Sequence, residues 1–367
     1  MIIKKLNLDK KLVYQSLKRD YGLDLLKIFA MINIINLHIN LKINFLKLNP
    51  QSLKFSHVFH LEIFSYWPVD AFGLISGIVG YKKYKFTNII YLWFIYEFYS
   101  IFSSIILYYK SKIDTNNLVL SFFPLGIRRN WYVNAYIFMY YFFPFITNSI
   151  NSINRNFYRK IVVHFFIIYS VYSEIIKYSG GNKDFNFIKN GYSSLWLFIL
   201  YIIGGYIGRF NIQKSKISKF LYLQIYLIIS FISSEYIIYN TRKYNYQYFS
   251  YISYSSPTII IQALSLIIFF SNLSINNRCL VKVITFLYPL NFSANIIHSR
   301  FFFSNSQSSK AIFKFINSLS PKYLFFKIYG ISITIYFICT FIDYFRSLLF
   351  KLIRIKNICN FIEKILF

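Results

Sequence analysis

Runs of apolar residues long enough to cross a lipid bilayer recur from one end of this 367-residue chain to the other. Basic clusters fall between these runs, and only 14% of the residues are charged, well below the level of a soluble domain of this length. Hydrophobic residues make up 56% of the chain. The sequence therefore predicts an all-α fold, a polytopic membrane bundle of transmembrane helices.

About ten transmembrane helices are expected. No internal repeat is visible and no linker is long enough to separate folded domains, so residues 22–345 are expected to form one transmembrane domain. The candidate spans lie at residues 23–41, 58–80, 88–109, 131–149, 161–178, 193–209, 219–240, 257–272, 282–299 and 323–345.

The distribution of Lys and Arg predicts how the bundle is oriented. An even number of spans places both termini on one side of the membrane, and the segments on that side hold more of the basic residues. Because positive charge concentrates in cytoplasmic segments, we expect both termini to be cytoplasmic and the chain to lie in the cell (inner) membrane. Residues 1–21 then form a basic cytoplasmic N-terminus, and residues 346–367 form a basic amphipathic tail along the inner surface.

The formal net charge of +29 does not indicate a nucleic-acid partner, because no soluble module is present to carry a basic face. Contact with anionic lipid headgroups or with an anionic cofactor fits the scattered charges better. Cys279, Cys339 and Cys359 are far apart in the sequence and contain no paired motif. They indicate neither a disulfide framework nor a metal site.

Two ionisable residues of the first span share one face of the expected helix. His38 lies inside the apolar run 25–41, and Lys27 stands eleven residues earlier. Eleven residues complete about three helical turns and rise ~16 Å, so both side chains project from the same side. Asp24 is a candidate salt partner for Lys27. His38 is the candidate acid, base or nucleophile, although packing against a neighbouring helix would also explain a buried histidine.

The second span holds a carboxylate near its middle and a basic loop after its end. Asp70 needs a partner or a wet cavity at that depth, which makes it a second candidate catalytic residue. Gly73 and Gly77 form a GxxxG spacing, which we interpret as a helix-packing site. The basic loop contains Lys82, Lys83 and Lys85, and the sequence leaves open whether it binds lipid phosphates or the phosphates of a soluble cofactor.

Polar stripes mark two later spans. The fourth span opens with Trp131 and Tyr132, typical of an interfacial aromatic belt. The ninth ends its stripe with His298, expected at the outer surface. Such stripes line a wet cavity or form interhelical hydrogen bonds. Glu97, Glu174 and Glu235 receive no role. The stripes are Asn134, Tyr141 and Asn148 in the fourth span, and Tyr288, Asn291, Asn295 and His298 in the ninth.

In these motifs and in their order, the chain resembles the membrane-bound acyltransferase-3 family over residues 20–345. The likeness starts at Tyr21–Lys27 and runs to His38, where the family has an arginine, ten intervening residues and a histidine. It continues in Val69–Gly77 with the basic loop, and in Trp131-Tyr132 of the fourth span. Further matches are Tyr136, Pro144, Ser256-Pro257, Gln262–Leu264 and Ile297-His298.

The resemblance implies an O-acetyltransferase that takes acetyl-CoA as donor and a cell-surface glycan or its lipid-linked precursor as acceptor. No metal is implied. The implied roles are catalysis by His38 and Asp70, and donor binding by Lys27 with Lys82, Lys83 and Lys85. The acceptor would meet Trp131, Tyr132, Asn295 and His298.

Two departures from the family pattern stand out. Lys27 replaces the usual arginine, which keeps the charge but loses the bidentate geometry of a guanidinium. The ninth span reads Phe-Ser-Ala-Asn-Ile-Ile-His, where the family more often has a glycine and a tyrosine. A carrier or flippase for a lipid-linked glycan is the alternative function, and a glycan polymerase is another. The Lys27–His38 spacing favours the acyltransferase.

Overall fold

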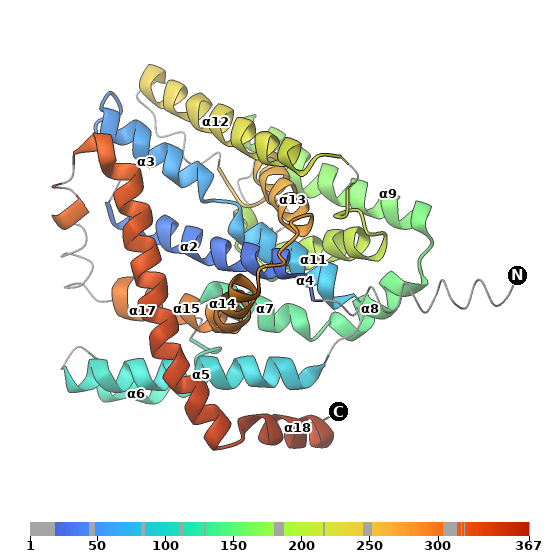
Figure 1. Ribbon diagram of the computed structural model, residues 1–367, viewed down its shortest axis with the longest axis vertical. Helices are drawn as coiled ribbons and strands as arrows, with labels where there is room; N and C mark the ends of the chain where they lie inside the picture. Colours follow the sequence, from blue (N-terminus) through green and yellow to red (C-terminus); the bar gives the residue numbers. More distant parts are fainter. Residues whose placement is uncertain are drawn as a thin grey trace, which may run out of the picture.

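The computed structural model describes residues 19–43, 48–81, 85–110, 113–127, 130–179, 187–215, 217–244, 252–303, 314–316, 318 and 320–366. Every regular element within these ranges is helical, as the sequence predicts (Figure 1). Helices are the natural solution for a chain in hydrocarbon, because each backbone N–H and C=O finds its partner within its own segment.

Six helical segments of the described chain are long and apolar enough to cross a membrane, so the protein is a multi-pass membrane protein. Four of these segments are single helices, and the other two are interrupted. The single helices are α2 (Tyr21–Ile43), α5 (Phe86–Tyr109), α12 (Lys219–Tyr244) and α17 (Leu324–Leu352). The interrupted ones are α3 (Leu53–Phe64) with α4 (Pro68–Gly80), and α14 (Arg278–Leu287) with η6 (Tyr288–Leu290), α15 (Asn291–Ile297) and η7 (His298–Phe303).

The other four predicted spans are helical but shorter or broken. Two are short apolar helices, α11 (Ser194–Arg209) and α13 (Pro257–Ser271). The count of ten spans and the cytoplasmic termini therefore stay predictions. The broken ones are α7 (Trp131–Tyr140) with α8 (Phe143–Ser152), and α9 (Arg155–Phe166) with η2 (Ile167–Tyr172) and α10 (Ser173–Tyr178). The remaining elements are α6 (Thr115–Leu120), η4 (Lys189–Gly191), η8 (Pro321–Tyr323) and α18 (Ile355–Leu366).

Prolines determine where two of the helices break. A proline removes one N–H and clashes with the carbonyl four residues earlier. Pro68 ends α3 at Phe64, whose carbonyl oxygen instead accepts hydrogen bonds from the Trp67 indole at 3.0 Å and the Tyr226 hydroxyl at 2.8 Å. Pro144 likewise ends α7 at Tyr140.

The break at Tyr140 overturns one sequence prediction. Asn134, Tyr141 and Asn148 were expected to form one polar stripe facing the bundle. Because the helix ends before Tyr141, the seven-residue spacing no longer keeps one face, and both Tyr141 and Asn148 are exposed. Asn134 is half-buried and donates to the Leu125 carbonyl at 3.4 Å.

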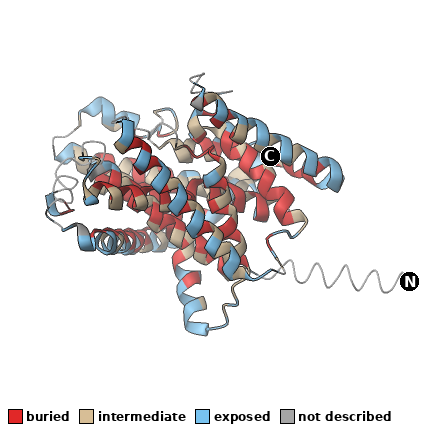
Figure 2. Cartoon of the chain, turned by 90° about the horizontal axis from the view of Figure 1, so that it is seen from above, coloured by how far each residue is buried: buried red, intermediate tan, exposed pale blue. Residues whose placement is uncertain are grey.

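Helix α2 lies in the middle of the bundle, against α3, α4, α13, α14, α15 and α17 (Figure 1). Figure 2 shows buried residues along the central helices and exposed residues on the outer ones. The outer helices α12 and α17 expose large apolar side chains, Phe231 and Phe341 among them. An apolar outer surface is what a helix needs when lipid rather than water surrounds it.

The C-terminal helix α18 packs against the start of α5. It buries Ile355 and Cys359 and exposes Lys356 and Lys364, so it is amphipathic as expected. The backbone N–H of Phe86 donates to the Glu363 carboxylate at 3.0 Å. The predicted position of this tail on the inner membrane surface stays a prediction.

Glycines let α4 and α11 approach until their backbones touch. The two helices run parallel, and a Cβ added to Gly77 would overlap the carbonyl oxygen of Tyr201. A Cβ on Gly204 of α11 would overlap the carbonyl oxygen of Leu74 in the same way. The packing role predicted for Gly73 and Gly77 is confirmed.

We expect Gly77→Ala to destabilise the protein by roughly 1–3 kcal/mol, because the added methyl group forces the two backbones apart. Gly330→Ala is the matched control, since a Cβ there meets no atom within 4 Å. That control should be neutral or stabilising by up to about 1 kcal/mol. Thermal unfolding in detergent measures both changes, and equal melting of the two variants would contradict the packing role.

Candidate active site

The predicted Lys27–His38 face of α2 packs against the interrupted segment 278–303. The Lys27 ammonium lies 4.9 Å from the ring centroid of Tyr288. His38 Nδ1 lies 2.8 Å from His298 Nε2. The earlier residue of α2 contacts the earlier residue of the segment, and the later contacts the later. The two segments therefore run parallel, and we call this contact the seam. The prediction that Lys27 and His38 project from the same side of the helix is confirmed.

His298 is fully buried within the bundle. Its expected position at the outer surface of the membrane stays a prediction. Both nitrogens of the His298 ring have partners within the bundle. Nε2 contacts His38, and Nδ1 lies 2.6 Å from the Ala294 carbonyl oxygen. The Phe303 ring lies nearly perpendicular to both imidazoles, and its centroid is 5.7 Å from that of His38 and 5.8 Å from that of His298. His298 is thus enclosed by these neighbours, whereas His38 is half-buried.

The rest of the ninth-span stripe also faces the bundle, as predicted. Asn291 and Asn295 are both buried, and Asn291 Oδ1 accepts a hydrogen bond from the Tyr336 hydroxyl at 2.7 Å. The role of Asn295 in acceptor binding stays a prediction.

The cationic end of the seam is a small charged cluster. Asp24 Oδ1 lies 3.3 Å from Lys27 Nζ, which confirms the predicted ion pair. Arg19, which the sequence did not single out, contacts Asp24 Oδ2 through Nε at 2.6 Å and lies over the Tyr288 ring at 4.6 Å. Two cations share one carboxylate, so a net positive charge remains at this end.

The basic loop is only partly described. Lys82 and Lys83 lie outside the described residues. Lys85 is exposed directly before α5, and its carbonyl oxygen accepts a hydrogen bond from the Tyr140 hydroxyl at 2.7 Å. Its role in donor binding stays a prediction.

Asp70 occupies a different helix–helix contact from His38. It lies fully buried on α4, and its Oδ1 accepts a hydrogen bond from the Trp196 indole of α11 at 3.0 Å. Its other oxygen has no hydrogen-bond partner among the described residues. This environment explains Asp70 as a carboxyl that joins α4 to α11, and its catalytic role stays a prediction.

Trp131 and Tyr132 begin α7 and are both half-buried. The centroid of the Trp131 ring lies 4.8 Å from that of Tyr192 and 6.1 Å from that of Tyr254. The Tyr132 ring stacks on Tyr136 with centroids 6.1 Å apart. Trp131 therefore belongs to a cluster of rings from three segments rather than to a lipid-facing belt alone.

A line of asparagines on another side of α2 was missed by the sequence analysis. Asn33 Oδ1 accepts hydrogen bonds from the Ser65 and Tyr329 hydroxyls at 3.0 and 2.8 Å. Asn40 donates to the Glu62 carboxylate at 3.0 Å. Asn36 continues the same line and accepts from Ser332. The spacing of three and four residues in an apolar run was the available signal.

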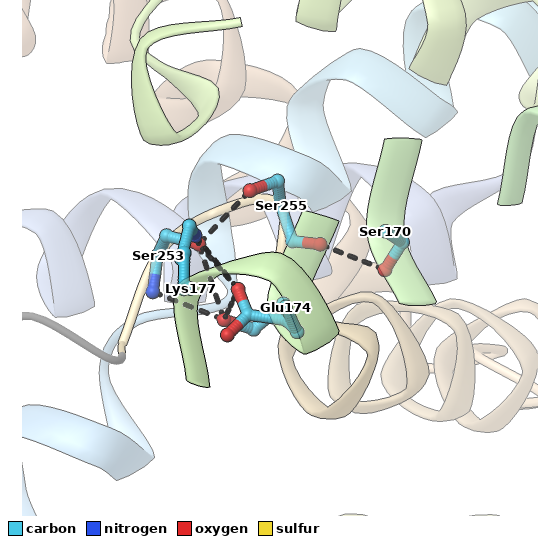
Figure 3. Close-up of polar contacts among 6 residues, drawn as sticks. Ser170, Glu174, Lys177, Ser253 and Ser255 are labelled. Carbon is cyan, nitrogen blue, oxygen red and sulfur yellow. Dashed lines mark hydrogen bonds and ion pairs between the residues drawn. The ribbon is translucent and has the colours of Figure 1, made fainter. Parts of the chain in front are cut away.

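A second buried polar cluster joins α10 to the loop before α13 (Figure 3). Lys177 Nζ lies 2.8 Å from both Glu174 Oε1 and Ser253 Oγ. Glu174 Oε1 also accepts from the Ser253 and Ser256 hydroxyls at 3.0 and 2.9 Å. Sequence analysis gave Glu174 no role, because nothing in its neighbourhood along the chain identifies a partner 79 residues away.

We expect Lys177→Met to destabilise the protein by about 3–5 kcal/mol, because it leaves the Glu174 carboxylate buried without its cation. Adding Glu174→Gln to that variant removes the charge while keeping an oxygen for the serines. The double variant should therefore be more stable than Lys177→Met alone. Denaturant unfolding in detergent measures the free energy of unfolding of each variant. If the effects of Lys177→Met and Glu174→Gln on that free energy simply add, the buried ion pair is contradicted.

No protein-family model, curated protein or solved structure matches this chain. The site is therefore interpreted from its own chemistry. Two imidazoles in direct contact within a membrane-spanning bundle can accept, hold and release a proton. A net positive charge lies at the other end of the same seam.

Proposed function

We propose that this protein is an integral membrane O-acyltransferase that moves an acetyl group from cytoplasmic acetyl-CoA to a hydroxyl of a cell-surface glycan or of its lipid-linked precursor. The observation that carries the proposal is the contact of His38 with His298 inside the bundle. An ionisable pair at that depth is costly to place, so it indicates function more than packing. The proposal includes ten spans with both termini cytoplasmic.

The cationic cluster supports the donor assignment. Lys27 and Arg19 share Asp24, so charge remains for the phosphates of acetyl-CoA. Lys82, Lys83 and Lys85 are proposed to add to this charge. Lys27 precedes His38 by eleven residues of helix, a rise of ~16 Å. A donor held at Lys27 would need its long pantetheine arm to extend along the seam to bring the thioester to His38.

His38 is proposed to act as the base. The acceptor oxygen bonds to the thioester carbonyl carbon while its proton passes to His38. The carbon–sulfur bond breaks, and the proton then passes to the departing thiolate, which leaves as the thiol of CoA. Trp131, Tyr132 and Asn295 are proposed to bind the acceptor. No step is assigned to Asp70, because it lies at the contact between α4 and α11 rather than beside His38.

We expect His38→Ala to lower acetyl transfer by at least ~10²-fold, because general base catalysis typically contributes that much. Isolated membranes are incubated with radiolabelled acetyl-CoA, and base-labile label in glycan is counted. His164→Ala is the matched control, since His164 is exposed on α9. Full labelling by His38→Ala, at equal protein levels, would refute the assignment. An unlabelled glycan in wild-type membranes would instead favour a carrier or polymerase.

We expect Lys27→Arg to keep or improve activity, since arginine retains the charge and adds the bidentate geometry suited to phosphate. Lys27→Met should raise the KM for acetyl-CoA about tenfold or more, because a lost charged hydrogen bond is worth about 1.5–3 kcal/mol. Steady-state kinetics over a range of acetyl-CoA concentrations measures kcat and KM for both variants. An unchanged KM in Lys27→Met would remove Lys27 from the donor site.

A further inference from the structure

The hydrogen bonds around His298 define which nitrogen of each imidazole carries a proton. A carbonyl oxygen can only accept, so the 2.6 Å contact with Ala294 requires a proton on His298 Nδ1. In a neutral ring, Nε2 is then an acceptor. The 2.8 Å contact with His38 therefore requires that His38 donates from its own Nδ1. The chain of donors runs from His38 through His298 to the backbone.

The alternative, a doubly protonated His298 that donates to His38, is disfavoured by its surroundings. The ring is fully buried in a membrane-spanning segment, and it has no carboxylate partner among the described residues. A cation there without an anion is expensive. The neighbours of His298 include a carbonyl, an imidazole and the Phe303 ring.

We infer that His298 is a positioning residue that holds His38 in its Nδ1–H tautomer, so that Nε2 of His38 carries the lone pair. Isolated imidazole side chains in water prefer the opposite tautomer, with the proton on Nε2. In that tautomer Nε2 has no lone pair and cannot accept a proton. The hydrogen bond made by one ring nitrogen of a histidine determines whether the other nitrogen carries a proton. The role inferred for His298 is therefore to position the base, in place of the predicted role in acceptor binding.

The same contact stabilises the protonated state. When His38 accepts a proton at Nε2, its ring becomes a cation, and its Nδ1–H donates more strongly to the neutral His298. The Phe303 ring packs against both imidazoles and restricts their rotation. This use of the inference rests on the proposed function, whereas the tautomer assignment does not.

The tautomer is tested directly by nitrogen-15 NMR of the full chain, labelled at histidine, in lipid nanodiscs at pH 8. The His38 signals are identified by their loss in His38→Ala. Wild-type His38 should carry its proton on Nδ1. His298→Leu should shift it toward the Nε2–H form, and His298→Gln should retain the wild-type form because its amide oxygen accepts the same hydrogen bond. An Nε2 proton in the wild-type protein, or no change in His298→Leu, overturns the inference.

Kinetics separates positioning from substrate binding. His298→Leu should lower kcat by ~10²-fold or more with little change in either KM, since a misassigned tautomer disables a catalytic histidine. His298→Gln should recover most of that loss. A rise confined to the KM for the acceptor would return His298 to substrate binding and overturn the inference. Expected NMR spectra without any acetyl transfer would refute the proposed function and leave the tautomer assignment standing.

Discussion

The packing of α2 against the segment 278–303 is the contact on which the rest of the bundle depends. Lipid offers no hydrogen bonds, so polar side chains within a span must find partners on other helices. α2 carries ionisable groups toward one neighbour and asparagines toward others. Lys27 and His38 meet Tyr288 and His298, while Asn33 is held by Ser65 and Tyr329. Each polar face therefore specifies which helix lies beside it.

The face of each helix could be predicted from the sequence, but its partner could not. Periodicity placed Lys27 and His38 on one side of α2 and predicted that the 288–298 stripe faces the bundle. It did not show that the two faces meet, because spacing along a helix carries no information about the neighbour. Nor did it show that His298 is covered, since the burial of a residue near the end of a span depends on the neighbouring helix, and here His38 lies against it.

The missed features share one physical cause. The contact of Glu174 with Ser253 and the Arg19–Asp24 pair join residues whose spacing along the chain follows no helical period. Helix breaks were missed for a similar reason: the fourth span was taken as one helix although Pro144 removes the hydrogen bond that would continue it past Tyr140. By contrast, the GxxxG of α4 was predictable, because close approach needs glycine wherever the partner comes from.

The short turn η6 explains how two segments of unequal spacing stay in register. Lys27 and His38 are eleven residues apart, but Tyr288 and His298 are ten apart. In an uninterrupted α-helix ten residues would rotate His298 about 80° away from the Tyr288 face. The three-residue 3₁₀ turn η6 (Tyr288–Leu290) adds ~20° of rotation and ~0.5 Å of rise per residue. Ten residues then span ~16.5 Å, as eleven do in α2, and both contacts form at once.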